Sequence, residues 1–279
     1  MKLITTAHEM SEFSRSSKEQ GNQVRFIPTM GALHKGHLSL VQQAKSDGGK
    51  IVVSVFVNPT QFNELSDLKN YPRTLEADSS LLQSENVDVL FFPSVEEIYP
   101  LGKGKTYNLD GLDSSMEGPN RPGHFNGVVE VVTRLFDIVQ PSSAYFGEKD
   151  FQQLAVIRHM TNKLGYKCNI VGCKTVREAN GLAMSSRNTR LSEDGKKTAS
   201  IISKCLNETK TKIQEGVLIN DIATTVSSKL ETTNGITLEY FELVDSETLL
   251  PAEQQTVNIQ ACIAAWVDDV RLIDNMQVK

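Results

Sequence analysis

The sequence predicts an α/β protein in which a parallel sheet flanked by helices precedes a smaller α+β domain. Short apolar runs alternate with helical patterns through the first two-thirds of the chain, as is typical of parallel strands joined by crossover helices. These runs lack the polar alternation of half-exposed strands. After about residue 176 the order changes, because two helical segments precede three strand-like segments.

Five apolar runs are expected to form the parallel sheet. The clearest is Ile51–Asn58, in which the residues from Ile51 to Val57 are apolar except for Ser54. A run of this kind is typical of a strand covered on both faces. The other expected strands are Val24–Ile27, Val87–Phe92, Ala144–Phe146 and Asn169–Val176.

Helical patterns and one turn-rich segment separate these strands. Apolar residues between Leu38 and Ala44 recur with helical spacing, and a further helix is expected from about Val128 to Val139, before Pro141. Between the third and fourth strands, residues 118–127 are rich in glycine, proline and asparagine. That composition predicts a mobile loop over a site.

The last third of the chain has the pattern of a second domain. Three strand-like segments there are expected to form an antiparallel sheet. We therefore expect residues 1–176 to form the sheet domain and residues 177–279 to form a smaller α+β lid domain. The expected elements are helices at Glu193–Glu208 and Leu218–Glu231, and strands at Thr237–Val244, Thr256–Trp266 and Val270–Ile273.

Composition indicates a globular protein and excludes some classes of partner. The 279 residues are 39% hydrophobic and carry a formal net charge of −5. No long block of lysine and arginine is present, which argues against nucleic-acid or anionic-membrane binding. The start lacks the apolar core of a signal peptide, and no apolar stretch is long enough to cross a bilayer. We therefore expect a cytoplasmic protein whose phosphate sites, if any, are locally basic.

The segment Pro28–His37 is the strongest candidate for a site. Its sequence, PTMGALHKGH, follows an expected strand and runs into an expected helix, so that Gly36 and His37 fall near a helix N-terminus. Free backbone N–H groups and the helix dipole favour an anion there. His34 and His37 add neutral or cationic donors, which suits a nucleotide phosphate whose charge shifts during a reaction.

His34 to His37 resembles the HxGH signature of a nucleotidyltransferase superfamily that also includes class I aminoacyl-tRNA synthetases. The longer run is similar to that of the pantothenate synthetase (pantoate–β-alanine ligase) family. Four further segments carry the same resemblance, in the expected order, although the final third resembles the family mainly in length. They are VFVNPTQF at 55–62, YPRT at 71–74, AYFGEKDFQQ at 144–153 and REANGLAMSSRN at 177–188.

The resemblance implies a Rossmann-like domain that binds ATP and pantoate at the carboxyl ends of the strands, with the active site between the two domains. His37 is implied to be the proton donor, and His34 to stabilise charge on the α-phosphate with it. Lys149 would supply positive charge for phosphate. The residues implied to bind ATP are Met30, Gly31, Ala32, Leu33, His34, Lys35, Gly36, His37, Gly147, Glu148, Lys149, Asp150, Val176, Met184, Ser185, Ser186 and Arg187.

Met184–Asn188 resembles the KMSKS loop of the wider superfamily, with Ser185, Ser186 and Arg187 in the part where lysines are common. Two hydroxyls and a guanidinium can hold the leaving pyrophosphate. Pantothenate synthetases carry this same departure, so the triplet supports the narrower resemblance.

The resemblance implies that neutral amide side chains bind pantoate. Gln61 and Gln153 can both donate and accept hydrogen bonds, which suits the hydroxyls and carboxylate of pantoate. Asn58 and Tyr71 are implied to lie nearby. Asp78 is our candidate for a ligand of Mg²⁺, which would accompany ATP as the cofactor. The resemblance also implies a homodimer.

The implied reaction is the ATP-dependent condensation of (R)-pantoate with β-alanine to pantothenate. It proceeds through a pantoyl adenylate and releases pyrophosphate and then AMP. Three alternatives remain open. A simple nucleotidyltransferase would need a basic acceptor pocket in place of the two glutamines, a tRNA-charging enzyme would need anticodon-binding mass and a basic face, and a nucleotide sensor would keep the fold without catalysis.

Overall fold

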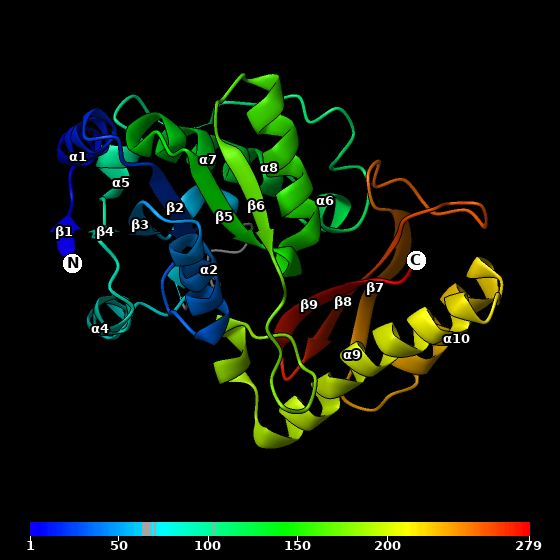
Figure 1. Ribbon diagram of the computed structural model, residues 1–279. Coiled ribbons are helices and arrows are strands. Elements are labelled where there is room, and N and C mark those ends of the chain that lie inside the picture. The colour runs from blue at the N-terminus through cyan, green and yellow to red at the C-terminus, as the bar shows by residue number, and fades with distance from the viewer. Residues whose placement is uncertain (63–67, 70, 103) are drawn as a thin grey trace. The chain divides into compact units, whose positions relative to one another are not determined.

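The computed structural model describes residues 1–62, 68–69, 71–102 and 104–279 (Figure 1). Internal packing divides the chain into two units. The first comprises Met1–Asp113, Gly118–Glu148 and Gln153–Lys174, and the second comprises Ser114–Glu117, Lys149–Gln152 and Thr175–Lys279. The second unit therefore includes two short segments from earlier in the chain. The division into a sheet domain of residues 1–176 and a lid domain of residues 177–279 stays a prediction.

The first unit is built on a six-stranded sheet in the order β1-β4-β3-β2-β5-β6. Every pairing in it is parallel, which confirms the predicted α/β fold with a parallel sheet. The strands are β1 (Lys2–Ile4), β2 (Val24–Thr29), β3 (Lys50–Val55), β4 (Val89–Phe91), β5 (Ser143–Gly147) and β6 (Asn169–Cys173).

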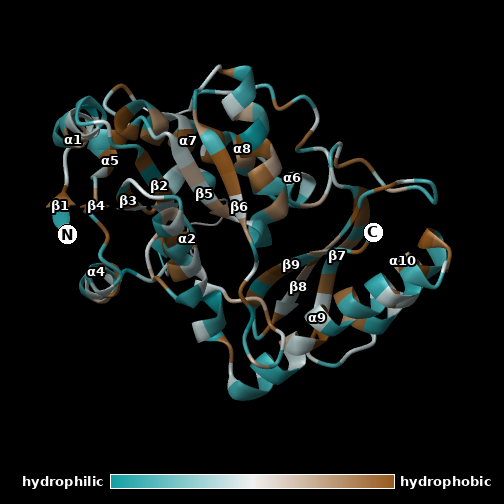
Figure 2. Cartoon of the chain, in the orientation of Figure 1, coloured by the Kyte–Doolittle hydropathy of each residue, from teal (hydrophilic) through white to brown (hydrophobic). Residues whose placement is uncertain are grey.

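Helices cover both faces of this sheet because successive strand residues point to opposite sides. Phe26 of β2 packs into one apolar core together with α1, α7 and α8, whereas its neighbour Ile27 packs into another with α2 and α4. Hydrophobic residues accordingly gather on the strands in Figure 2. The helices of this unit are α1 (Ala7–Glu19), α2 (Lys35–Ser46), α4 (Leu75–Ser84), α5 (Val95–Ile98), α7 (His124–Val139) and most of α8 (Phe151–Lys163).

Strand order locates the expected binding edge. The chain passes from β2 to β3 and β4 on one side, and later returns to β5 and β6 on the other. The order therefore reverses between β2 and β5, and ligands of such sheets bind outside the carboxyl ends of the strands at that point. The segments that follow these two ends begin at Met30 and Glu148.

The segment 118–127 differs from the predicted loop. The short helix α6 covers Glu117–Asn120, and α7 begins at His124. The prediction of a loop here was wrong for most of the segment, because the buried apolar face of α7 outweighs the weak helix propensity of its glycine and asparagine. Gly127 has a packing role: a Cβ there would lie 2.4 Å from the carbonyl oxygen of Thr60. The start of α7 and the residues 59–61 therefore approach closely.

The second unit contains an antiparallel sheet in the order β7-β8-β9, as the sequence predicts. The odd-numbered residues of β8, from Ile259 to Val267, pack into a core with α9 and α10. The even-numbered residues, such as Gln260 and Cys262, face the other way. The elements are α9 (Glu193–Gln214), α10 (Ile219–Glu231), β7 (Thr237–Asp245), β8 (Ile259–Val267) and β9 (Val270–Gln277).

Hydropathy distinguishes the two sides of the helices in this unit. The ribbon of α9 mixes hydrophilic and hydrophobic residues in Figure 2, and the buried apolar residues of α9 and α10 belong to the core of the second unit. Among the residues described, no helix has the length and apolar character to span a membrane.

Candidate functional site

A strained turn leads from β2 into α2. Gly31 and Ala32 both have positive φ, at 84° and 49°, and the backbone N–H of Gly31 donates to Thr29 Oγ1 at 3.2 Å. A Cβ on Gly31 would lie 3.0 Å from both Asp78 Oδ2 and Val55 Cγ1. Glycine therefore serves this position through its conformational freedom and its lack of a side chain.

Asp78 holds this turn from α4. Its side chain is 1% exposed. Oδ2 accepts the backbone N–H of Ala32 at 3.0 Å, and Oδ1 accepts that of Leu33 at 2.8 Å. Thr74 Oγ1 donates to Oδ1 at 3.2 Å. Both carboxylate oxygens are thus bonded within the fold, to the two residues that directly precede the HxGH motif.

The two histidines cap the N-terminus of α2. His34 Nδ1 accepts the N–H of Gly36 at 3.1 Å, and His37 Nδ1 accepts the N–H of His34 at 3.3 Å. The rings are 4.1 Å apart between centroids. Because Nδ1 is the acceptor in both rings, a neutral imidazole carries its proton on Nε2. The backbone thereby sets both tautomers, and each ring presents an N–H donor at Nε2.

Gln61 lies beside this turn, within the first unit. Its Nε2 is 2.9 Å from Met30 Sδ, and its Oε1 accepts from Asn58 Nδ2 at 3.2 Å. Asn58 is buried, donates to the carbonyl of Gly127 at 3.1 Å, and accepts from the Tyr99 hydroxyl at 2.8 Å. The structure thus brings predicted ATP and pantoate residues together here.

Two residues that the sequence did not single out as ligands support Gln61 and Asn58. His124, on the first turn of α7, is 2.8 Å from the carbonyl oxygen of Gln61 through Nδ1. Burial raises the pKa of Tyr99 to about 12, so its hydroxyl stays a donor to Asn58 at neutral pH. A lone tyrosine and a histidine in a turn-rich segment carry no sequence signal for this role.

The remaining pantoate candidates occupy different settings. Tyr71 is 6% exposed and its ring contacts that of Phe62 edge to face, with centroids 5.6 Å apart. Gln153 is partly buried in the first turn of α8. Its role in binding pantoate stays a prediction.

Lys149 and Asp150 belong to the second unit. Lys149 Nζ contacts Asp150 Oδ1 at 3.1 Å, and the Lys149 carbonyl accepts from Asn275 Nδ2 of β9 at 2.7 Å. Gln260 Nε2 of β8 donates to Asn275 Oδ1 at 2.6 Å. Two buried amides of the C-terminal sheet therefore hold the backbone of the predicted phosphate lysine.

The serine–arginine loop is organised in the same unit. Ser185 caps the short 3₁₀ helix Ser186–Arg190 by accepting the N–H of Arg187 at 3.3 Å. Met184 N–H donates to the carbonyl of Val176 at 2.9 Å, which pairs two predicted ATP residues. The buried Asn188 donates to Glu178 Oε1 at 2.7 Å, so this loop is fixed from within.

Segment 114–117 packs on the polar face of the C-terminal sheet. Glu117 is 6% exposed and accepts two hydrogen bonds from Arg271 at 2.8 Å each and one from the Tyr240 hydroxyl at 2.7 Å. Arg271 also pairs with Glu239. Burial and the Glu117 carboxylate raise the pKa of Tyr240 well above its usual value. Glu117 therefore has a structural role in the second unit.

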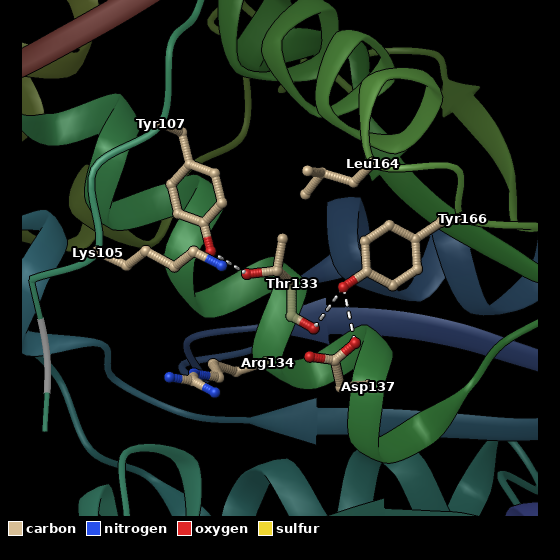
Figure 3. Close-up of a pocket in the computed structure, with 7 residues that line it drawn as sticks. All are labelled: Lys105, Tyr107, Thr133, Arg134, Asp137, Leu164 and Tyr166. Atoms are coloured by element: carbon tan, nitrogen blue, oxygen red, sulfur yellow. Dashed lines mark hydrogen bonds between the residues drawn. The ribbon is translucent and has the colours of Figure 1, made fainter. Parts of the chain in front are cut away.

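A small cavity of about 60 Å³ lies elsewhere on the first unit and is lined by none of the predicted site residues (Figure 3). Its hydroxyls are bonded to one another or to the chain. Tyr166 donates to Asp137 at 2.7 Å, and Tyr107 is 3.0 Å from Thr133 Oγ1. With these groups already paired, the cavity adds nothing to the candidate site.

The described residues do not form a metal-binding cage. In the ranges that the structure covers, no group of three or more histidine, cysteine, aspartate or glutamate side chains could hold an ion. Asp78 uses both oxygens on backbone N–H groups. The residues present thus fit a Mg²⁺ ion only if phosphate and water supply most of its ligands. Asp78 as a ligand stays a prediction.

Comparisons with known proteins point to one family. The family model for pantoate-beta-alanine ligase matches residues 2–277. Pantothenate synthetase of Bacteroides thetaiotaomicron is 47% identical over 281 residues, covering 100% of this chain and 99% of that protein. Pantothenate synthetase of Flavobacterium psychrophilum is 47% identical over 261 residues, covering 92% of each.

Solved structures extend the likeness to the fold. Pantothenate synthetase of Thermus thermophilus is 42% identical with a TM-score of 0.93, and covers 100% of this chain and 99% of its own. Pantoate-beta-alanine ligase of Francisella tularensis, solved with β-γ ATP and β-alanine, is 34% identical with a TM-score of 0.83, covering 100% of this chain and 98% of its own. The resemblance drawn from the motifs is thus confirmed across the chain, which belongs to the pantoate-beta-alanine ligase family.

Proposed function

We propose that this protein catalyses the ATP-dependent condensation of (R)-pantoate with β-alanine to pantothenate. The observation that carries the proposal is the pair of backbone-fixed imidazoles, His34 and His37, at the carboxyl end of β2. Such donors suit phosphate chemistry, and the chain belongs along nearly its whole length to a family named for this ligation.

The first step activates the acid. A carboxylate oxygen of pantoate attacks the α-phosphorus of ATP, the bond from that phosphorus to the bridging oxygen breaks, and pyrophosphate leaves. Negative charge moves onto the phosphate oxygens as this occurs. The Nε2–H groups of His34 and His37 stabilise that charge as hydrogen-bond donors. His37, in its protonated form, donates a proton to the leaving pyrophosphate.

The second step forms the amide. The amine of β-alanine attacks the acyl carbon of the pantoyl adenylate, a proton leaves the nitrogen, and AMP departs with the oxygen that bridged carbon and phosphorus. Activation is required because a free carboxylate is a poor acyl donor to an amine. Exclusion of water protects the mixed anhydride while β-alanine attacks.

The substrate-binding residues follow from the family's motifs. Gln61, Gln153, Asn58 and Tyr71 are assigned to pantoate. The contact between Gln61 and Met30 supports a pantoate site next to the nucleotide turn. The residues assigned to ATP, besides the turn from Met30 to His37, are Gly147, Glu148, Lys149, Asp150, Val176, Met184, Ser185, Ser186 and Arg187.

Mg²⁺, a homodimer and a cytoplasmic location complete the proposal. Mg²⁺ bound with ATP would neutralise charge on the phosphates, and phosphate and water would be its main ligands. The small-molecule partners are ATP, pantoate and β-alanine. The negative net charge supports the absence of nucleic-acid partners.

Exchange of labelled pyrophosphate into ATP tests the first step in isolation. We expect exchange with Mg²⁺ and pantoate present and β-alanine omitted, and none without pantoate. Substitution His37→Ala should slow exchange by about 10²- to 10⁴-fold, because it removes a proton donor. The matched control is His8→Ala, at an exposed histidine of α1, which should exchange at the wild-type rate.

A different outcome would change the assignment. Exchange that occurs without pantoate would indicate transfer of the nucleotide to another acceptor. Binding of ATP with no exchange under any of these conditions would favour a nucleotide sensor.

A further inference from the structure

We propose that Asp78 is a positioning residue of the nucleotide site, which holds the turn before the HxGH motif through its backbone N–H groups. The inference rests on the proposed function, because it assigns a purpose to that turn. It differs from the role expected from the sequence, in which Asp78 is a ligand of Mg²⁺.

The carboxylate occupies a backbone concavity. Ala32 and Leu33 direct successive N–H groups at its two oxygens, at 3.0 and 2.8 Å. Successive N–H groups in a turn form a nest that binds an anion. Here the anion is a side chain of the protein itself, the Asp78 carboxylate, which is 1% exposed. Hydrogen bonds from N–H groups to a carboxylate are charge-assisted.

The turn requires such a partner because its backbone is strained. Ala32 has a φ of 49°, which L-residues with a Cβ seldom adopt. Strain of this kind persists only where the surroundings determine it. Asp78 also leaves no space for a side chain at Gly31, whose Cβ would lie 3.0 Å from Oδ2.

The position of the turn controls the histidines. Leu33, whose N–H Asp78 accepts, directly precedes His34, the N-cap of α2. His34 in turn donates its N–H to His37 Nδ1. A shift of the turn would therefore move both imidazoles, although Asp78 contacts neither ring in any hydrogen bond described.

The existing bonds argue against a metal ligand. Three donors already approach the two oxygens, from Ala32, Leu33 and Thr74. Asp78 is part of no metal-type cluster within the residues described. With three of about four acceptor sites occupied and the residue 1% exposed, this carboxylate has little left with which to coordinate an ion.

Substitution Asp78→Asn separates the two roles. The amide has the same size but presents one NH₂ donor to a backbone N–H that needs an acceptor. We expect kcat for pantoate-dependent pyrophosphate exchange to fall by about 10- to 100-fold, as for a small misplacement of catalytic groups. The Mg²⁺ concentration for half-maximal rate should not change.

The matched control is Asp88→Asn. Asp88 also accepts a backbone N–H, that of Ile51 at 2.9 Å, together with Lys50 Nζ at 2.9 Å. It lies at the amino ends of β3 and β4, away from the HxGH turn. Its substitution should leave the exchange rate and the Mg²⁺ dependence unchanged.

A second variant covers the case in which Asp78→Asn does not fold. Thr74→Val removes one hydrogen bond to Oδ1 and keeps both backbone bonds, so it should reduce kcat by only a few-fold. Calorimetric measurement of ATP affinity in the absence of pantoate tests the role of Asp78 in the nucleotide site. This test holds even if pantoate is not the acid substrate.

The outcomes discriminate between the roles. A fall in kcat at every Mg²⁺ concentration supports the positioning role. A rise in the half-maximal Mg²⁺ concentration, with the rate restored at saturating Mg²⁺, would overturn it in favour of a metal ligand. Wild-type rates and wild-type ATP affinity in Asp78→Asn would also overturn it.

Discussion

At the scale of single residues, backbone hydrogen bonds determine how the side chains of the candidate site can act. His34 and His37 accept N–H groups through Nδ1, so their proton positions follow from helix capping. Asn58 is oriented by Gly127 and Tyr99. A motif predicts which residue types are present, but such partners come from distant segments that no local pattern identifies.

Tyr99 makes the first unit lose stability as the pH rises above about 10. Burial raises its pKa to about 12 in the folded state, whereas in the unfolded chain its pKa is about 10. Above pH 10 the unfolded state therefore loses a proton that the folded state keeps, and the free energy of unfolding falls as pH rises.

We expect Tyr99→Phe to reduce this decline. The free energy of unfolding, measured in urea between pH 8 and 11.5, should fall less steeply in the variant than in the wild type. At pH 8 the variant should be less stable by about 1 kcal/mol, the net value of a buried hydrogen bond. Equal slopes for the two proteins would contradict the account.

At the scale of elements, the sequence predicts strands better than it predicts the start of α7. The apolar run at Ile51–Val57 predicts a buried strand, and β3 (Lys50–Val55) is found there. Residues 118–127 are mostly turn formers, but the last four of them begin α7, and the apolar face farther along that helix decides the outcome through tertiary packing. The three-residue strand β1 and the helix α1 were not predicted from the sequence. β1 is too short to show the pattern of apolar residues that identifies a strand.

The close approach of α7 to residues 59–61 predicts the effect of Gly127→Ala. The new Cβ would lie 2.4 Å from the Thr60 carbonyl oxygen, so the segment that carries Gln61 has to shift. We expect a loss of about 1–3 kcal/mol in stability, as for other overpacked sites, and a higher KM for pantoate with a smaller change in KM for ATP.

A matched control separates packing from positioning. Val131→Ala removes buried volume from the same helix, in the apolar core. It should lower stability while leaving KM for pantoate unchanged. If both variants raised KM for pantoate equally, general destabilisation would explain the result.

At the scale of the whole molecule, the predicted ATP residues are divided between the two units. Met30 to His37, Gly147 and Glu148 belong to the first, whereas Lys149, Asp150, Val176 and the residues from Met184 to Arg187 belong to the second. The sequence predicts a domain boundary near residue 176 from a change of pattern. It does not predict that residues 149–152 belong to the second unit, because their place there depends on a hydrogen bond from Asn275, 126 residues later than Lys149.

Asn275 tests whether the C-terminal sheet positions Lys149. Asn275→Asp removes the donor to the Lys149 carbonyl and places an acceptor beside it. We expect KM for ATP in the exchange reaction to rise by about 10-fold, which corresponds to roughly 1.4 kcal/mol. Asn207→Asp is the control, because Asn207 Nδ2 also donates to a carbonyl at 2.7 Å but lies on α9. Equal effects of the two substitutions would refute the positioning role.

The most direct test of the central claim follows an oxygen atom. Pantoate labelled with ¹⁸O in its carboxylate is converted with ATP and β-alanine, and the AMP and pantothenate are analysed by mass spectrometry. Attack of the carboxylate on the α-phosphorus predicts one ¹⁸O in each AMP and the other in the new amide. Label in inorganic phosphate, with ADP as the nucleotide product, would mean an acyl phosphate instead and would contradict the adenylate mechanism.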